Sequence, residues 1–251
     1  MKTGAIIQAR MSSTRFPEKI LKELIGNITI LDVLIDRISS CEFIDSITLA
    51  TSLNPKDKIL ENFSKTKGIN FFAGSENDVL ERYYLCAKRY ELDNIIRVTA
   101  DDPFKDPAVI KKAYDIFINN SLDYVSNTLK PSYPEGIDIE IFNFISLKEA
   151  FLNANLPSER EHVTPYIWKN SDLFKLKNFT AEVDYSNYRL TVDYEEDYNL
   201  AKKILKHFYP NITFSYKQII EFLQSKNITS YKIERNEGYK NSIKMEKNNE
   251  Y

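Results

Sequence analysis

A cationic, hydroxyl-rich segment follows the first apolar run of the chain, Ala5–Ile7. It extends from Gln8 to Lys19 and contains Arg10, Arg15 and three hydroxyl residues. Guanidinium forks, an ammonium group and small hydroxyl donors together suit a polyphosphate. The segment lacks the glycine-rich phosphate cradle of a P-loop. Composition alone favours a solvated charged loop without a ligand, so the choice depends on the pattern of residues.

Two aspartates each follow a predicted buried strand. Asp101 comes just after Asn94–Thr99, and Asp193 comes just after Tyr188–Val192. Open parallel sheets bind ligands at the carboxyl ends of their strands. Two carboxylates brought together there can hold a Mg²⁺ that also takes phosphate oxygens. Taken singly, each aspartate is equally explained as a first-turn or capping acid of the next helix, and Asp197 is such an acid by its position.

Strands and helices alternate through the first half of the chain. Hydrophobic periodicity predicts strands at 47–52, 69–73, 94–99 and 123–126, and helices at 30–38, 54–67, 79–90 and 107–119. This alternation is typical of βαβ units around a mostly parallel sheet. The later pattern is looser, with strands expected at 137–144, 173–179 and 188–192 and helices at 146–153, 158–168, 195–208 and 216–226.

Composition excludes several classes of protein. The chain has 251 residues and a formal net charge of −2, which gives no electrostatic case for nucleic-acid binding. Cys41 and Cys86 lack metal-ligand spacing and suggest no disulfide framework, so a reducing compartment is expected. The opening apolar run is too short for a signal peptide, and no stretch is long enough to span a membrane. A cytoplasmic location is therefore expected.

Residues 9–19 stand as A-R-M-S-S-T-R-F-P-E-K. This segment resembles the A-R-x-G-S-x-R-x-P-x-K signature of sugar nucleotidyltransferases with a GT-A-like fold. The likeness is to the cytidylyltransferases of the spore-coat polysaccharide and acylneuraminate type, with Ser12 in place of the glycine. Residues 99–103 and 191–197 resemble the family's T-G-D-x-P and T-V-D-x-x-x-D segments, with Ala100 in place of a glycine, and residues 74–82 resemble G-S-x-x-D-V-L-x-R.

The resemblance implies an α/β fold, a single Rossmann-type three-layer domain with a mostly parallel central sheet. It implies a nucleotidyltransferase domain at 1–230, an acceptor-binding and possible dimerisation part at about 129–180, and a polar tail at 231–251. That tail is expected to order weakly unless a partner or substrate holds it. The implied catalytic residues are Arg10, Lys19 and Asp101, with Mg²⁺ on Asp101 and Asp193. The implied nucleotide-binding residues are Gln8, Ala9, Arg10, Ser13, Arg15, Lys19, Ser52, Arg82 and Thr99.

The segments 133–140 and 156–164 also match the family and place acceptor binding there. Asp138 and Glu140 share a strand face by their two-residue spacing. Arg160 could clamp a carboxylate or phosphate bidentately. His162 could bind an acceptor hydroxyl or act as a base, although a surface or interface position explains it equally. Ser158 and Glu161 have the spacing of a capping box.

The resemblance therefore implies transfer of CMP from CTP to a sugar acid, sugar phosphate or related acceptor, with release of pyrophosphate, in surface polysaccharide or glycoconjugate synthesis. The base and the acceptor stay open, and a homodimer is expected. One alternative is a GT-A-type glycosyltransferase, which normally carries Asp-x-Asp where this chain has the adjacent acids Asp101 and Asp102. The other is a non-catalytic nucleotide-binding subunit of a polysaccharide assembly.

Overall fold

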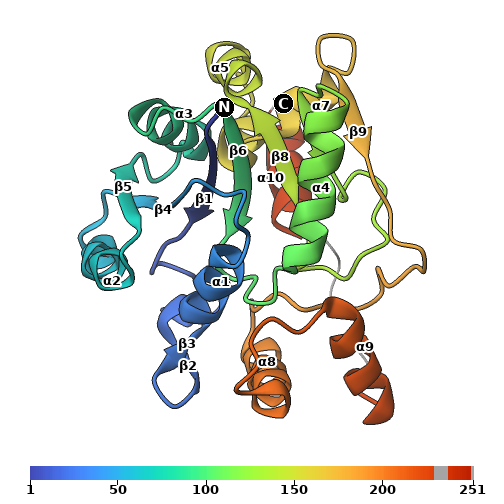
Figure 1. Ribbon diagram of the computed structural model, residues 1–251. Helices are drawn as coiled ribbons and strands as arrows, with labels where there is room; N and C mark the ends of the chain where they lie inside the picture. Colours follow the sequence, from blue (N-terminus) through green and yellow to red (C-terminus); the bar gives the residue numbers. More distant parts are fainter. Residues whose placement is uncertain (229–236, 250–251) are drawn as a thin grey trace.

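A seven-stranded sheet forms the centre of the computed structural model, which describes residues 1–228 and 237–249 (Figure 1). The strand order is β5-β4-β1-β6-β8-β7-β9. The strands are β1 (Thr3–Gln8), β4 (Ser46–Ser52), β5 (Asn70–Gly74), β6 (Asn94–Thr99), β7 (Tyr124–Ser126), β8 (Glu140–Asn143) and β9 (Leu176–Asn178). Among the described strands of this sheet, β8 alone runs antiparallel to its neighbours, β6 and β7. A separate short hairpin joins β2 (Glu23–Ile25) to β3 (Ile28–Thr29).

Helices cover both faces of the sheet, which confirms the predicted α/β architecture. One apolar core includes residues of α1 (Ile30–Ser39), α2 (Ile59–Lys67), α4 (Pro107–Asn119), α8 (Glu195–Phe208) and α9 (Tyr216–Ser225). The other includes residues of α3 (Val79–Arg89), α5 (Phe144–Asn153) and α7 (Pro165–Lys169), and α6 (Pro157–His162) packs on α3. Ile6 and Ile7 belong to opposite cores because successive side chains of β1 point to opposite faces.

The register of the parallel strands brings the predicted site segments to one edge of the sheet. Gln8, the last residue of β1, pairs with Ala50 of β4 and with Thr99, the last residue of β6. The loop after β1 therefore starts beside the segment that carries Asp101. The Val192 amide donates to the backbone carbonyl of Asp101 at 2.9 Å, so the segment before Asp193 lies against the same edge.

Three predictions for the second half of the chain are wrong. Residues 188–192 form no strand and make only a single bridge, Glu135 to Arg189. Their apolar side chains are buried, which explains the strand-like pattern. The predicted helix 158–168 is two helices, because Val163 has φ 72° and Pro165, which lacks an N–H, begins α7. The predicted Ser158–Glu161 capping box is absent, since α6 already begins at Pro157.

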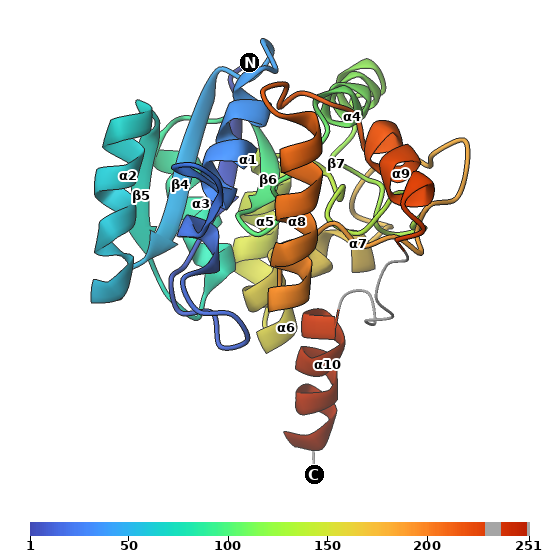
Figure 2. The ribbon, with the colours of Figure 1, turned by 90° about the horizontal axis from the view of Figure 1, so that it is seen from below.

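The described part of the C-terminal tail forms a helix that its composition did not predict. Glu237–Asn249 form α10, which contacts α6 (Figure 2). Residues 231–236 and 250–251 of the tail lie outside the described residues. The predicted domain division at residue 230 stays a prediction. Within the described residues, no helix is both long and apolar enough to cross a membrane.

Candidate active site

Two adjoining cavities lie at the edge of the sheet where the parallel strands end. The first has a volume of about 660 Å³ and lies beneath the loop after β1. The second has a volume of about 420 Å³ and lies between β6, β8 and the α6–α7 segment. Both cavities are lined by Arg15, Thr99, Asp101 and Asp193. These four residues mark the junction at which molecules in the two cavities could meet.

Most of the predicted nucleotide-binding residues line the first cavity. They are Gln8, Ala9, Arg10, Ser13, Arg15, Lys19, Arg82 and Thr99. The Oε1 atom of Gln8 is buried and has no hydrogen-bond partner within the described part of the chain. Buried polar atoms without partners are rare, and such an atom at a cavity wall fits a ligand contact. The exposed side chain of Arg10 lies at the same cavity.

The hydroxyl of Ser52, a predicted nucleotide-binding residue, makes a hydrogen bond inside the protein. It donates to Asp57 Oδ2 at 2.5 Å, and Ser52 does not line the first cavity. Asp57 also accepts from the Thr51 hydroxyl at 2.8 Å and from the Met11 amide at 2.8 Å. Burial alone would raise the pKa of Asp57, but these hydrogen bonds lower it. The charged Asp57 therefore anchors the start of the β1 loop through Met11.

Arg82 and Arg160 shape the opposite wall of the first cavity. Arg82 is buried and donates to the backbone carbonyl of Ser75 at 2.9 and 2.6 Å. Arg160 pairs with Asp78 at 2.5 Å, where Asp78 also caps the start of α3. Asp78 holds the Arg160 guanidinium at the first cavity, and Arg160 does not line the second. The acceptor contact of Arg160 stays a prediction.

A network of opposite charges occupies the junction. Lys19 Nζ lies 2.8 Å from Asp101 Oδ2 and 2.8 Å from Asp193 Oδ1. Asp193 also pairs with Arg15 at 2.6 Å and with Arg189 at 2.6 Å. Burial alone would raise the pKa of Asp193, but Lys19 and Arg15 hold it well below its usual range. Burial would lower the pKa of Lys19, and the two aspartates raise it. Lys19 and Asp193 are therefore both charged.

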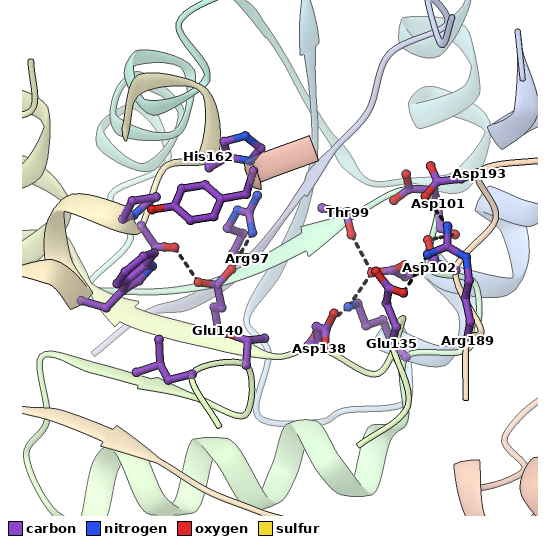
Figure 3. Close-up of a pocket in the computed structure, with 18 of the residues that line it drawn as sticks. Arg97, Thr99, Asp101, Asp102, Glu135, Asp138, Glu140, His162, Arg189 and Asp193 are labelled. Atoms are coloured by element: carbon purple, nitrogen blue, oxygen red, sulfur yellow. Dashed lines mark hydrogen bonds and ion pairs between the residues drawn. The ribbon is translucent and has the colours of Figure 1, made fainter. Parts of the chain in front are cut away.

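The second cavity brings together three of the predicted acceptor residues, Asp138, Glu140 and His162. Figure 3 shows Glu140 and His162 near Arg97, away from the group formed by Asp101, Asp193 and Arg189. β8 begins only at Glu140, so Asp138 precedes the strand, although both carboxylates line the cavity. The backbone carbonyl of Asp138 accepts from the Lys105 ammonium.

Glu140 is the buried centre of a hydrogen-bond cluster. It accepts from Arg97 Nη1 at 2.5 Å, from the Tyr124 hydroxyl at 2.6 Å and from the Thr164 hydroxyl at 2.6 Å. Burial would raise the pKa of Glu140, but Arg97 and the hydroxyl donors lower it. A charged carboxylate with these three donors fixes the base of the second cavity, whether or not it also contacts a ligand.

His162 connects the second cavity to the C-terminal helix. Its Nε2 lies 3.1 Å from the Ser242 hydroxyl of α10, and its ring meets the Tyr239 ring edge-on at 5.3 Å. Burial lowers the pKa of His162 to about 4, so the imidazole is neutral at pH 7. A neutral imidazole keeps one nitrogen lone pair that can accept a hydrogen bond.

Residues 4–237 match a family model described as Cytidylyltransferase. The chain belongs to the cytidylyltransferase family. It is 38% identical over 237 residues to an uncharacterized protein of Methanocaldococcus jannaschii, covering 92% of this chain and 95% of that one. It is 34% identical over 206 residues to the spore coat polysaccharide biosynthesis protein SpsF of Bacillus subtilis, covering 79% and 84%.

A solved cytidylyltransferase from Leptospira borgpetersenii superposes with a TM-score of 0.87 and 35% sequence identity, covering 94% of this chain and 100% of that one. Together these matches confirm the predicted family and show that this cytidylyltransferase is a nucleotidyltransferase. They argue against both alternatives, a GT-A-type glycosyltransferase and a non-catalytic nucleotide-binding subunit.

The donor set of the cytidylyltransferase fits Mg²⁺ better than a transition metal. Asp101 and Asp193 offer carboxylate oxygens at the junction, and their facing oxygens share the Lys19 ammonium. Among the described residues, no group of three or more His, Cys, Asp or Glu side chains could hold a metal ion. Mg²⁺ commonly binds one or two carboxylates and completes its shell with water and substrate phosphates. Asp101 and Asp193 match that ligand set and are the residues that would hold Mg²⁺.

The sequence did not single out Arg97, Glu135 and Arg189, although all three line the second cavity. Arg189 pairs with Glu135 at 2.7 Å and with Asp193, so it positions the carboxylate at the junction. The available signal was a cation inside an apolar stretch: Arg97 lies within Asn94–Thr99, and Arg189 lies within Tyr188–Val192. A buried cation requires a buried partner, which makes such positions candidates for a site.

Proposed function

We propose that this cytidylyltransferase transfers CMP from CTP to a sugar acid, a sugar phosphate or a related sugar-like acceptor, with Mg²⁺ and with release of pyrophosphate. The observation that carries the proposal is the shared junction of the two cavities. Arg15, Thr99, Asp101 and Asp193 line both of them, so a nucleotide in the first and an acceptor in the second would meet there.

The charges of the first cavity support a triphosphate as its ligand. Arg10, Arg15 and Lys19 all line it, and together they can neutralise a developing negative charge. An acceptor oxygen attacks the α-phosphorus, an oxygen–phosphorus bond forms, and the bond to the bridging oxygen of the β-phosphate breaks. An acceptor that attacks through a hydroxyl also releases its proton to solvent. Pyrophosphate takes the bonding electrons and leaves. This in-line displacement depends on positioning and charge stabilisation more than on a covalent intermediate.

Mg²⁺ held by Asp101 and Asp193 would neutralise charge on the triphosphate and the leaving pyrophosphate. Lys19 and Arg189 hold these carboxylates at the junction. In the second cavity, carboxylates and the neutral His162 can accept hydrogen bonds from acceptor hydroxyls. The likeness to a spore coat polysaccharide protein supports a role in surface polysaccharide or glycoconjugate synthesis. A cytoplasmic homodimer is part of the same proposal.

The test is pyrophosphate release with Mg²⁺ from CTP, UTP, GTP and ATP in turn. Each nucleotide is combined with N-acetylneuraminic acid, 3-deoxy-manno-octulosonic acid, glucose 1-phosphate or erythritol 4-phosphate. We expect release with CTP and an acceptor of this panel, at one pyrophosphate per CMP conjugate. Release that prefers another nucleotide would contradict the choice of CTP. No release together with no CTP-induced rise in melting temperature would contradict the nucleotide site itself.

A further inference from the structure

Three aromatic rings form a continuous wall on one side of the second cavity. Tyr239 of α10 lies between His162 of α6 and Trp168 of α7, and all three residues line the cavity. The Tyr239 ring centroid is 5.6 Å from that of Trp168 at an interplanar angle of 72°, and 5.3 Å from that of His162 at 87°. Edge-to-face contacts at these distances stabilise aromatic clusters. We call these three residues the aromatic wall.

Specific polar contacts hold α10 in this position. Glu246 accepts from the Ser158 backbone amide at the start of α6 and from the Ser158 hydroxyl, which lies 3.0 Å away. Ser242 donates to Glu161 at 2.7 Å and contacts His162. Ser158 is fully buried, so its amide and hydroxyl need partners inside the protein. The contacts of Ser242 and Glu246 with α6 thus fix the helix that carries Tyr239.

The second cavity also has a polar lining. Glu135, Asp138 and Glu140 line it and can accept hydrogen bonds. A sugar ring also combines polar and apolar surface. Its hydroxyls lie around the rim and suit the carboxylates, whereas its apolar C–H faces suit the aromatic wall. Binding pockets typically combine aromatic surface with a few directed polar groups, and covering an apolar face with aromatic carbon is favourable.

We propose that α10 is part of the acceptor site and that Tyr239, with Trp168, binds the apolar face of a cyclic, pyranose-type acceptor. The inference rests on the proposed CMP transfer and narrows its acceptor to a ring. An acyclic polyol phosphate can satisfy the carboxylates, but it offers no rigid C–H face to the aromatic wall. Tyr239 therefore selects ring acceptors over acyclic ones, and it acts on acceptor binding and not on CTP binding.

The first test compares steady-state kinetics of the full-length wild type with Tyr239→Leu, Tyr239→Phe and Met245→Ala. Met245 is on the same helix and is 67% exposed, so it is a matched control. The wild type should use a ring acceptor in preference to erythritol 4-phosphate. Tyr239→Leu should raise the KM of that acceptor roughly tenfold, the effect of about 1.4 kcal/mol, and leave the KM of CTP unchanged. Tyr239→Phe should restore most of the affinity.

A preference for erythritol 4-phosphate, or an unchanged acceptor KM in Tyr239→Leu, would overturn the inference while leaving CMP transfer intact. The second test needs no turnover, because Trp168 is the only tryptophan of the chain. N-acetylneuraminic acid, 3-deoxy-manno-octulosonic acid and glucose 1-phosphate are titrated against tryptophan emission. We expect a saturable change in emission with at least one ring compound. The concentration that gives half of this change should be roughly tenfold higher in Tyr239→Leu. No change with any of the three would overturn the inference even if pyrophosphate release had failed.

Discussion

Replacement of Glu140 by alanine should destabilise the protein strongly, because this carboxylate stabilises the base of the second cavity. Its side chain is 10% exposed and that of its partner Arg97 is 16% exposed. Glu140→Ala leaves the Arg97 guanidinium and the hydroxyls of Tyr124 and Thr164 without their acceptor. Breaking a buried pair by removing one partner costs about 3–5 kcal/mol. For a chain of this size, the melting temperature should fall by roughly 10 °C.

A double-mutant cycle separates the ion pair from the loss of side-chain volume. Arg97→Met, Glu140→Met and the double variant are unfolded in urea, with the exposed Glu42→Ala as a control that should change the free energy of unfolding by less than about 0.5 kcal/mol. We expect the double variant to be more stable than the sum of the single variants predicts, by about 1–3 kcal/mol. Additive single effects, or a loss below about 1 kcal/mol in Glu140→Ala, would refute the proposed cluster.

Two further predictions concern Lys19 and His162. Lys19→Gln removes the ammonium that Asp101 and Asp193 share, so kcat should fall by about 10²–10³ in a pyrophosphate-release assay; a kcat within threefold of wild type would exclude Lys19 from the chemistry. Burial lowers the pKa of His162 from 6.5 to about 4, so the unfolded chain takes up the proton more readily. Stability is therefore fully present above pH 6.5 and declines as the pH falls towards 4. Over this range the free energy of unfolding, measured in urea, should fall by at most about 3 kcal/mol. In His162→Gln it should fall less with decreasing pH than in the wild type.

The regular half of the fold could be predicted because its strands are long and buried and its helices are amphipathic. β1, β4 and β6 each have six or seven residues, enough for an apolar run to stand out. The short strands β7 and β9 were also predicted, within 123–126 and 173–179, but three residues each are too few for a periodicity to define where a strand begins and ends. Residues 188–192 are held in a buried position by hydrogen bonds and ion pairs of single residues, without a ladder of strand pairs. An apolar pattern does not distinguish such a segment from a strand.

The residue types of the candidate site could be predicted, but their pairings could not. The predicted strand ends at residues 99 and 192 indicated Asp101 and Asp193, although only the first is a strand in the structure, and the β1 loop indicated Lys19. The contacts between them join positions 82 and 174 residues apart, which no local pattern reveals. Arg160 illustrates the same limit, because its partner Asp78 is 82 residues away. The helix α10 makes polar contacts with α6, and its weakly apolar sequence gave no sign of this docking.

The central claim is that CMP transfer takes place at the junction of the two cavities, and Asp101→Asn tests it most directly. This substitution keeps the size of the side chain and removes its charge. The assay follows CTP labelled at the α-phosphorus into the acceptor conjugate, with CTP binding and the melting temperature measured in parallel. We predict that kcat falls by at least about 10²-fold, while the variant stays folded and still binds CTP. A folded Asp101→Asn variant with wild-type kcat would contradict the account.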